Sequence, residues 1–226
     1  MKINSCIFSY EITKGMKSFG PKGLLKSKKS KELINCQIKT LSDFVNQTYV
    51  IVGFGSDKLI KKISTMKGII ILKNDNFKSA NEGYALSLLL NNYQHDTSDG
   101  LLIISNGLLL NFAKIKFDKS KIFFTTKKTK YDFNIGCVFD ESNNFLENMF
   151  YNINDSVWCE SIYMCNKEIQ ILKKYMRTID VKNMFLFEII NNSIKYGAEY
   201  SGEFIPTSKI LKIQSTKDSN KIKEVI

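Results

Sequence analysis

The stretch GLLIISNGLLLN, residues 100–111, decides the fold of this chain. It holds a short apolar run that stops at Ser105, Asn106 and Gly107, after which three leucines follow. Asn and Gly tolerate the positive φ angles of tight turns, and a short continuous apolar run is typical of a strand buried on both faces. We therefore expect a buried strand that ends in a turn at residues 105–107.

Similar apolar runs alternate with helical patterns on the amino-terminal side of this stretch. We expect strands at 3–8, 49–54, 68–72 and 101–105. We expect helices at 31–44, 57–64 and 84–93, the second of them capped by Ser56. This alternation predicts a mostly parallel sheet with helices on both faces, in which ligands bind at the carboxyl ends of the strands.

The second half of the chain changes character. Three apolar runs, at 122–126, 133–140 and 157–164, follow one another without helices and predict antiparallel additions to the sheet. Further elements are expected as helices at 166–176 and 185–197, a strand at 210–213, and a helix at 215–226 that begins with a Ser/Thr cap. No repeat or linker divides residues 1–226. We predict a single α/β domain, a three-layer sandwich with a central mixed, mostly parallel sheet.

Composition limits the kind of protein. No apolar stretch approaches the roughly 20 residues that span a membrane, and the amino terminus reads as a strand and not as a signal peptide. Of 33 basic residues, Arg177 is the single arginine, which suggests an AT-rich genome, viral or of a streamlined bacterium. We expect a cytoplasmic protein without membrane partners, or a virion component if the source is viral.

Cysteine and histidine usage argues against two kinds of site. The cysteines are scattered without a CxxC pair and read as single buried thiols; they are Cys6, Cys36, Cys137, Cys159 and Cys165. The only histidine, His95, lies in a polar stretch and reads as a surface residue. Zinc binding and histidine-based catalysis are therefore not expected.

The net charge of +11 favours nucleotides or nucleic acids as partners. Sequence-specific DNA reading usually relies on arginine forks, which this chain lacks. The densest basic cluster, at residues 26–31, reads as a solvated loop. A nucleic-acid-binding module stays open as an alternative function.

A basic loop follows the first predicted strand. In EITKGMKSFGPKGLLKSKKSKELINCQIKTL (11–41), Gly15, Pro21, Lys22, Leu24 and Leu25 fit a pattern of the form AAGxGSR…PKALL, and Lys17 stands at its arginine. With this pattern and its order of segments, nearly the whole chain resembles the sugar-phosphate and choline-phosphate nucleotidyltransferases. The resemblance implies that Lys17 and Lys22 neutralise the phosphates of a nucleoside triphosphate. On residue type alone, both could equally be solvated lysines.

A second motif lies in LKNDNFKSANEGYALSLLL (72–90). Asn81, Tyr84, Ser87 and Leu88 correspond to the family pattern N-x-x-S-L at the start of a helix. The resemblance implies that Asn81 and Ser87 border the base and the acceptor phosphate. The residues also allow a reading without ligand, in which Asn74, Asn76 and Asn81 satisfy turns and cap the helix.

The resemblance further implies two metal-binding aspartates. Relatives read NGDVLF after the fourth strand, where this chain has Leu108, and EIDTPEDL before the last helix, where it has Gln214. Neither side chain can hold Mg²⁺ with the usual affinity. Three carboxylates remain as conceivable substitutes, although each also reads as a loop charge, a strand-edge residue or a helix cap: Asp75, Glu160 and Asp218.

The favoured function is therefore a degenerate nucleotidyltransferase that is catalytically inactive, binds no metal, and has a structural, assembly or vestigial nucleotide-binding role. The first alternative is an active, Mg²⁺-dependent enzyme that makes an activated sugar or choline from a nucleoside triphosphate and a phosphorylated acceptor. The second is the basic nucleic-acid-binding module. Whether the chain is an enzyme stays open at this point.

Overall fold

A computed structural model describes residues 3–12, 17–27, 31–93, 100–126, 134–153 and 155–224. The chain forms two compact units, which we call unit A (Lys2–Ser79, Ile103–Ile115, Ser208–Ile226) and unit B (Ala80–Leu102, Lys116–Thr207). The expectations for Gly15, His95, the lysines among 28–30 and the last two residues fall outside the described residues.

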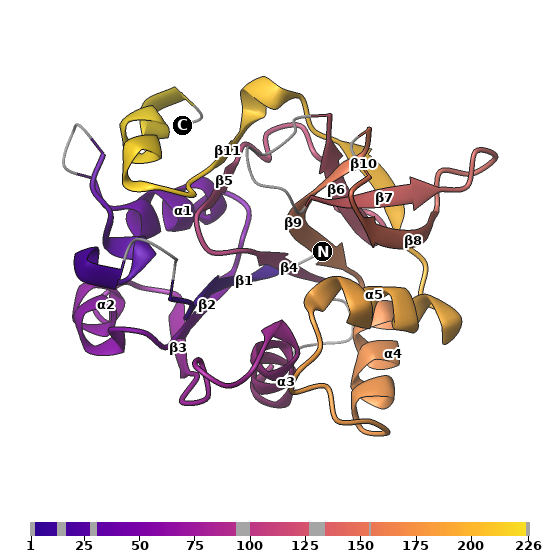
Figure 1. The fold of residues 1–226 in the computed structure, drawn as a ribbon, viewed down its shortest axis with the longest axis horizontal. Coiled ribbons are helices and arrows are strands. Elements are labelled where there is room, and N and C mark those ends of the chain that lie inside the picture. Colours follow the sequence, from indigo (N-terminus) through magenta and orange to yellow (C-terminus); the bar gives the residue numbers. More distant parts are fainter. Residues whose placement is uncertain are drawn as a thin grey trace. The chain divides into compact units, whose positions relative to one another are not determined.

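Unit A contains the first predicted alternation of strands and helices (Figure 1). Its elements are β1 (Ile3–Ser9), η1 (Lys17–Phe19), η2 (Lys22–Leu24), α1 (Leu33–Ser42), β2 (Gln47–Val52), α2 (Ser56–Ile63), β3 (Ile69–Lys73), β5 (Leu108–Leu110), β11 (Ile210–Lys212) and η4 (Thr216–Glu224). β2 pairs in parallel with both β1 and β3, so that Val50 lies between Ile7 and Ile71. All residues of β1 are buried, as its apolar run predicted.

The start of α2 differs from the prediction. Ser56 is the first helical residue and not the cap; the N-cap position belongs to Gly55, whose φ is 60°. A side chain on Gly55 would also lie 2.8 Å from the Pro21 ring. The left-handed backbone and the close approach of Pro21 together explain why glycine stands there.

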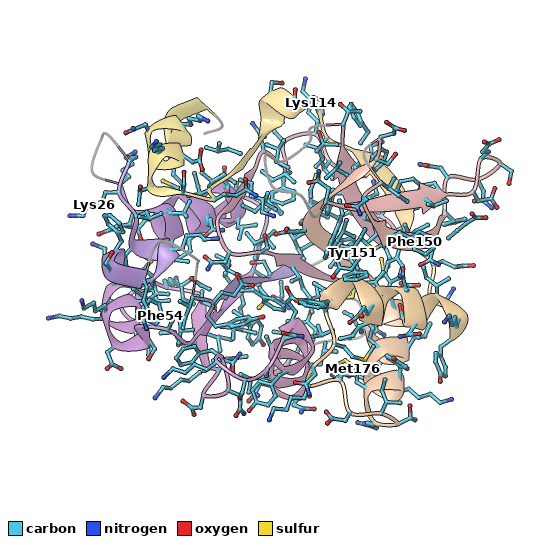
Figure 2. The ribbon with its side chains drawn as sticks, viewed as in Figure 1. Lys26, Phe54, Lys114, Phe150, Tyr151 and Met176 are labelled. Atoms are coloured by element: carbon cyan, nitrogen blue, oxygen red, sulfur yellow. The ribbon has the colours of Figure 1, made fainter. Side chains whose placement is uncertain are left out.

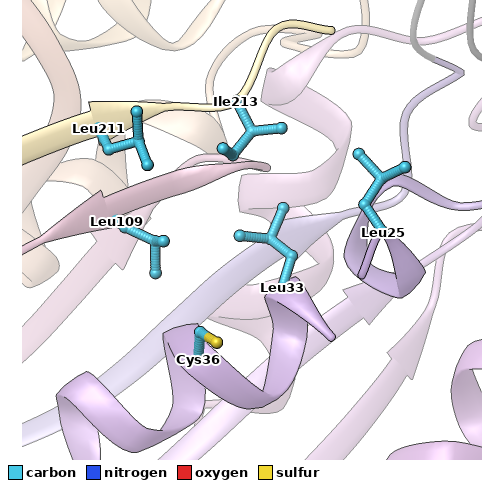
Figure 3. Close-up of a cluster of buried hydrophobic side chains, with 6 residues drawn as sticks. All are labelled: Leu25, Leu33, Cys36, Leu109, Leu211 and Ile213. Carbon is cyan, nitrogen blue, oxygen red and sulfur yellow. The ribbon is translucent and has the colours of Figure 1, made fainter. Parts of the chain in front are cut away.

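Two short strands of unit A make a separate antiparallel pair, β5–β11. Figure 3 shows the side chains that this pair buries against α1 and the η2 turn. The cluster consists of Leu25, Leu33, Cys36, Leu109, Leu211 and Ile213. Through this cluster, β5 and β11 pack against the amino-terminal segment of the same unit that contains η2 and α1.

Unit B begins with a helix and then gathers strands in the predicted antiparallel manner. Its elements are α3 (Glu82–Asn92), β4 (Gly100–Ile104, with its last two residues in unit A), β6 (Lys121–Thr125), β7 (Ile135–Phe139), β8 (Leu146–Tyr151), β9 (Val157–Met164), α4 (Asn166–Met176), α5 (Leu186–Lys195), β10 (Ser201–Phe204) and, at its end, η3 (Thr207–Lys209). β6 pairs antiparallel with β9, and β7 with β8 and β9. β10 is the exception, because it runs parallel to β6.

Hydrogen bonding orders the strands β10-β6-β9-β4 in unit B and β4-β1-β2-β3 in unit A. The chain therefore has the predicted α/β fold with a central mixed, mostly parallel sheet. Three strands, β5, β8 and β10, were not predicted. β5 and β10 are short, and β8 buries only Leu146 and Met149.

The three helices of unit B pack on one another (Figure 1). Gly83 makes this possible near the start of α3, because a Cβ there would lie 2.0 Å from the Val181 carbonyl oxygen. α5 ends at Lys195, and Gly197, the predicted stop, follows its C-cap Tyr196 with a φ of 89°. All five cysteines are free; four of them are buried and Cys165 is half-buried. Among the described residues, the apolar helices are all too short to cross a bilayer.

Candidate functional site

The turn after β4 has the predicted place and geometry. Gly107 has a φ of 87°, and the Leu108 N–H lies 3.3 Å from the Ser105 carbonyl oxygen. The Gly107 carbonyl oxygen accepts the Ile213 N–H at 2.9 Å. A Cβ on Gly107 would lie 2.8 Å from the Ile213 carbonyl oxygen, so a larger residue would push the two segments apart.

Leu108 lies in β5, directly after this turn, and its side chain is 1% exposed. In the β5–β11 pair it faces Lys212, two residues before Gln214. The two positions that the resemblance assigns to metal-binding aspartates therefore lie on neighbouring segments of unit A. These positions are neighbours because β5, the strand formed by the leucines after the turn, pairs with β11; β4 does not make this pair.

Gln37, which the sequence did not single out, fixes this turn from α1. Its Nε2 donates to the Leu108 carbonyl oxygen at 2.9 Å and to the Ser105 carbonyl oxygen at 3.2 Å. The residue is buried in spite of its polar side chain. A polar residue on the apolar face of a predicted helix was the signal that could have found it.

Lys22 is buried, which makes the solvated reading wrong for this residue. Its ammonium donates to the Asn106 carbonyl oxygen at 3.2 Å, and its Cδ would lie 2.7 Å from a Cβ on Gly107. The Asn106 side chain is also buried, and within the described residues neither its Oδ1 nor its Nδ2 has a hydrogen-bond partner. Buried polar groups without partners are rare, so Asn106 marks a place suited to an additional polar group.

Lys17 lies in the same unit but in a different setting. It begins η1, a single turn without buried residues, and is exposed. Of the two lysines that the resemblance assigns to phosphate, Lys22 alone is held against the turn after β4. The solvated reading stays open for Lys17.

Asp218 holds the start of η4 together. Its Oδ2 accepts the N–H groups of Gln214 and Ser215, at 3.1 and 2.9 Å, and the Ser215 hydroxyl at 2.9 Å. Burial raises the pKa of Asp218, but these bonds lower it further, so that its pKa lies below the usual value. Ser215 directly precedes η4, where the Ser/Thr cap was predicted, and its N–H and hydroxyl both donate to the Asp218 carboxylate; the predicted helix is a 3₁₀ helix.

The other conceivable substitutes for the aspartates lie in unrelated places. Asp75 is exposed and pairs with Lys73 at 3.5 Å, while the Asn74 side chain accepts the Asn76 N–H at 3.0 Å in the same turn. Glu160 lies within β9 with a φ of 54°, where the pairing with β6 shifts register. In the described part of the chain, no three His, Cys, Asp or Glu side chains form a group that could hold a metal ion.

Asn81 and Ser87 belong to unit B. Asn81 stands at the N-cap of α3, but its Nδ2 donates to the Asn183 carbonyl oxygen at 2.6 Å instead of its Oδ1 capping the helix. Ser87 lines a pocket between α3 and α4 together with Asn91 and Lys173. Lys22 and these two residues lie in different units, so their joint role at one nucleotide stays a prediction.

No protein-family model matches the chain, and no curated protein has a matching sequence. Solved structures do match. CTP:phosphocholine cytidylyltransferase from Streptococcus pneumoniae has a TM-score of 0.78 at 16% identity over 100% of this chain and 99% of that one. Inositol-1-phosphate CTP transferase from T. maritima has a TM-score of 0.73 at 13% identity, over 99% and 97% of the two chains.

A third match is a nucleoside-diphosphate-sugar pyrophosphorylase from Vibrio cholerae, with a TM-score of 0.74 at 9% identity over 97% of this chain and 98% of that one. Identities this low establish the fold and not the activity. The chain has the α/β fold of these nucleotidyltransferases, from its first described strand to its last.

Proposed function

We propose that the chain is a nucleotidyltransferase-like protein that binds a nucleoside triphosphate at the turn after β4 without transferring its nucleotidyl group. The observation that carries this proposal is the contrast within one turn of unit A. Lys22 is buried against the Asn106 carbonyl oxygen, while Leu108, two residues on from Asn106, is buried as a strand residue.

Binding is supported by the buried Asn106 side chain, which lies beside the turn that Lys22 contacts. A ligand oxygen or amide near Asn106 would satisfy this side chain, and polyphosphate oxygens would also pair with the positive charge of Lys22. In this account Lys22 holds the phosphates by charge.

Loss of transfer chemistry is supported by the residues at the two aspartate positions. Nucleotidyl transfer depends on cations that neutralise phosphate charge, and neither an apolar side chain nor an amide replaces a carboxylate as a Mg²⁺ ligand. Losing both ligands removes several kcal/mol of transition-state stabilisation, on the order of 10³-fold in rate or more. Asp218 does not restore the site in this proposal, because its carboxylate accepts three hydrogen bonds at the start of η4.

Calorimetric titration with CTP, UTP, ATP and GTP, with and without Mg²⁺, tests the proposal. We expect binding in the range of about 0.1–1 mM that changes less than about twofold with Mg²⁺. Lys22→Met keeps the aliphatic stem that packs on Gly107 and removes the charge, so it should weaken binding about tenfold or more. Lys26→Met is the matched control, because Lys26 is exposed on the same segment and projects from the ribbon (Figure 2).

Stability separates a lost ligand contact from a damaged fold. Thermal unfolding of Lys22→Met close to the wild-type temperature would show that a loss of nucleotide binding is not a loss of fold. Absence of nucleotide binding at millimolar concentrations would remove the nucleotide role and leave a structural or assembly role. Equal losses of nucleotide affinity in Lys22→Met and Lys26→Met would show that the effect comes from the overall positive charge and not from a contact with Lys22.

One observation favours the active alternative. Two of the matching structures are named as transferases and match 100% and 99% of this chain. An active protein would need a metal site built from other carboxylates, with Asp75, Glu160 and Asp218 as the candidates. Nucleotide binding that strengthens markedly with Mg²⁺ would favour this alternative.

A further inference from the structure

A second cationic place lies in unit B, between α3 and α4. A pocket of about 310 Å³ opens there, lined by Ser87, Leu90, Asn91, Tyr93, Lys173, Met176 and Arg177. The lining follows from helix geometry. Residues 87, 90 and 91 of α3, and residues 173 and 176 of α4 with its C-cap residue 177, stand at spacings of three and four, which place each set on one face. Met176 lies on the side of α4 that faces α3 (Figure 2).

In the described part of unit B, neither cation of this pocket, Lys173 or Arg177, forms an ion pair, although Lys167 on α4 pairs with Glu199 at 2.7 Å. Burial and the nearby Arg177 guanidinium lower the pKa of Lys173. The Lys173 ammonium lies 5.9 Å from the centre of the buried Tyr93 ring, which holds it toward the pocket.

Arg177 strengthens the case for a ligand. It is the one arginine in a chain that otherwise uses lysine, and a guanidinium matches phosphate oxygens with a fixed fork of donors that an ammonium lacks. The ordinary role for these cations is to offset the negative ends of α3 and α4. Each helix carboxyl end carries about half a negative charge, so the two full positive charges of Lys173 and Arg177 leave a net positive charge that can bind an anion.

We propose that the pocket between α3 and α4 binds the phosphate group of a small phosphorylated molecule. Lys173 and Arg177 bind the phosphate oxygens, and Ser87 and Asn91 supply neutral hydrogen-bond donors from the facing helix. The apolar side of the pocket, formed by Leu90 and Met176, packs on a short carbon skeleton. A volume of about 310 Å³ suits such a ligand, at the lower end of small-molecule sites.

Titrations with inorganic phosphate and with ethyl phosphate, followed by calorimetry at constant ionic strength, test this site. We expect Lys173→Met to weaken both ligands about tenfold and Arg177→Lys to weaken them about threefold or more. Ethyl phosphate should bind more tightly than inorganic phosphate, because its carbon atoms contact the apolar side. Lys174→Met is the matched control: it removes the same charge from an exposed position one residue away.

Three outcomes would overturn the proposal: no binding of either probe at about 10 mM, an equal loss in Lys174→Met and Lys173→Met, or no gain from the ethyl group. Circular dichroism and thermal unfolding of each variant show that a loss is not a loss of fold. Titrations of Lys22→Met separate this site from the nucleotide proposal. That variant should keep ethyl phosphate binding, whereas Lys173→Met should keep nucleoside triphosphate binding.

Discussion

The resemblance assigns a metal-binding aspartate to each of two segments of unit A, and the residues at these two places differ in environment. After β4, Leu108 is buried and paired in a strand. At the start of η4, Gln214 stands in the aspartate position, and the carboxylate of Asp218 accepts backbone N–H groups. One segment is apolar core, while the other holds a carboxylate that stabilises the local backbone.

Introducing a carboxylate at the apolar segment should have the largest effect. Leu108→Asp places a charge in a strand position that is 1% exposed, and we expect it to lower the free energy of unfolding by about 3–5 kcal/mol at pH 7. Chemical denaturation measures the change. Leu108→Asn is the matched control, since it keeps the shape and omits the charge; an equal loss in both variants would show that charge burial is not the cause.

The double variant Leu108→Asp with Gln214→Asp asks whether the two segments still face one ion. If they do, about 10 mM Mn²⁺ should return about 1 kcal/mol of stability to the double variant and much less to either single variant. Thermal unfolding with and without Mn²⁺ provides the measurement. Equal gains in single and double variants would show that the segments no longer form one site.

Gly107→Ala should have the next largest effect on the turn itself. Its φ of 87° disfavours any other residue, and the added Cβ would meet the Ile213 carbonyl oxygen and Lys22, so we expect a loss of about 2–3 kcal/mol. Gly20→Ala is the matched control, because Gly20 has a φ of 84° with no atom within 4 Å of an added Cβ. An equal loss of stability in Gly20→Ala would show that backbone strain explains the whole effect. It would then contradict a contribution from the close approach of the Ile213 carbonyl oxygen and Lys22.

Asp218→Asn should have the smallest effect, and a defined pH dependence. Asparagine keeps one acceptor oxygen, so we expect a loss of about 1 kcal/mol at pH 7. The folded-state pKa of Asp218 lies below its usual value, so its charge stabilises the fold above the ordinary aspartate pKa and loses this effect as pH falls through the folded value. The difference between wild type and variant should therefore shrink below about pH 4; a difference that stays constant into acid would contradict this role.

The sequence predicted the strands of unit A well, because each is a compact apolar run bounded by turn residues. It failed where tertiary context decides the structure. β5 has three leucines and gains its identity from pairing with β11, a partner about 100 residues away in the chain. β10, with Gly202 and Glu203, has no apolar pattern and becomes a strand beside β6.

The candidate site shows the same division. Residue type and spacing pointed to Lys22 and to the turn before Leu108, but burial of Lys22 depends on contacts with a loop more than 80 residues further along the chain. The same is true of Gln37 and of the pocket around Lys173 and Arg177, where α3 and α4 meet. A sequence pattern identifies one face of a single helix or strand, whereas each of these sites forms where two segments of the chain meet.

Pyrophosphate release tests the central claim most directly. The protein is incubated with nucleoside triphosphates, Mg²⁺ or Mn²⁺, and a mixture of sugar phosphates and phosphocholine, with an active nucleotidyltransferase as the positive control. Our account predicts nucleotide binding that depends on Lys22 and pyrophosphate release no higher than without protein. Sustained release that disappears when Asp75, Glu160 or Asp218 is replaced would contradict it and show that a metal site has been rebuilt from other carboxylates.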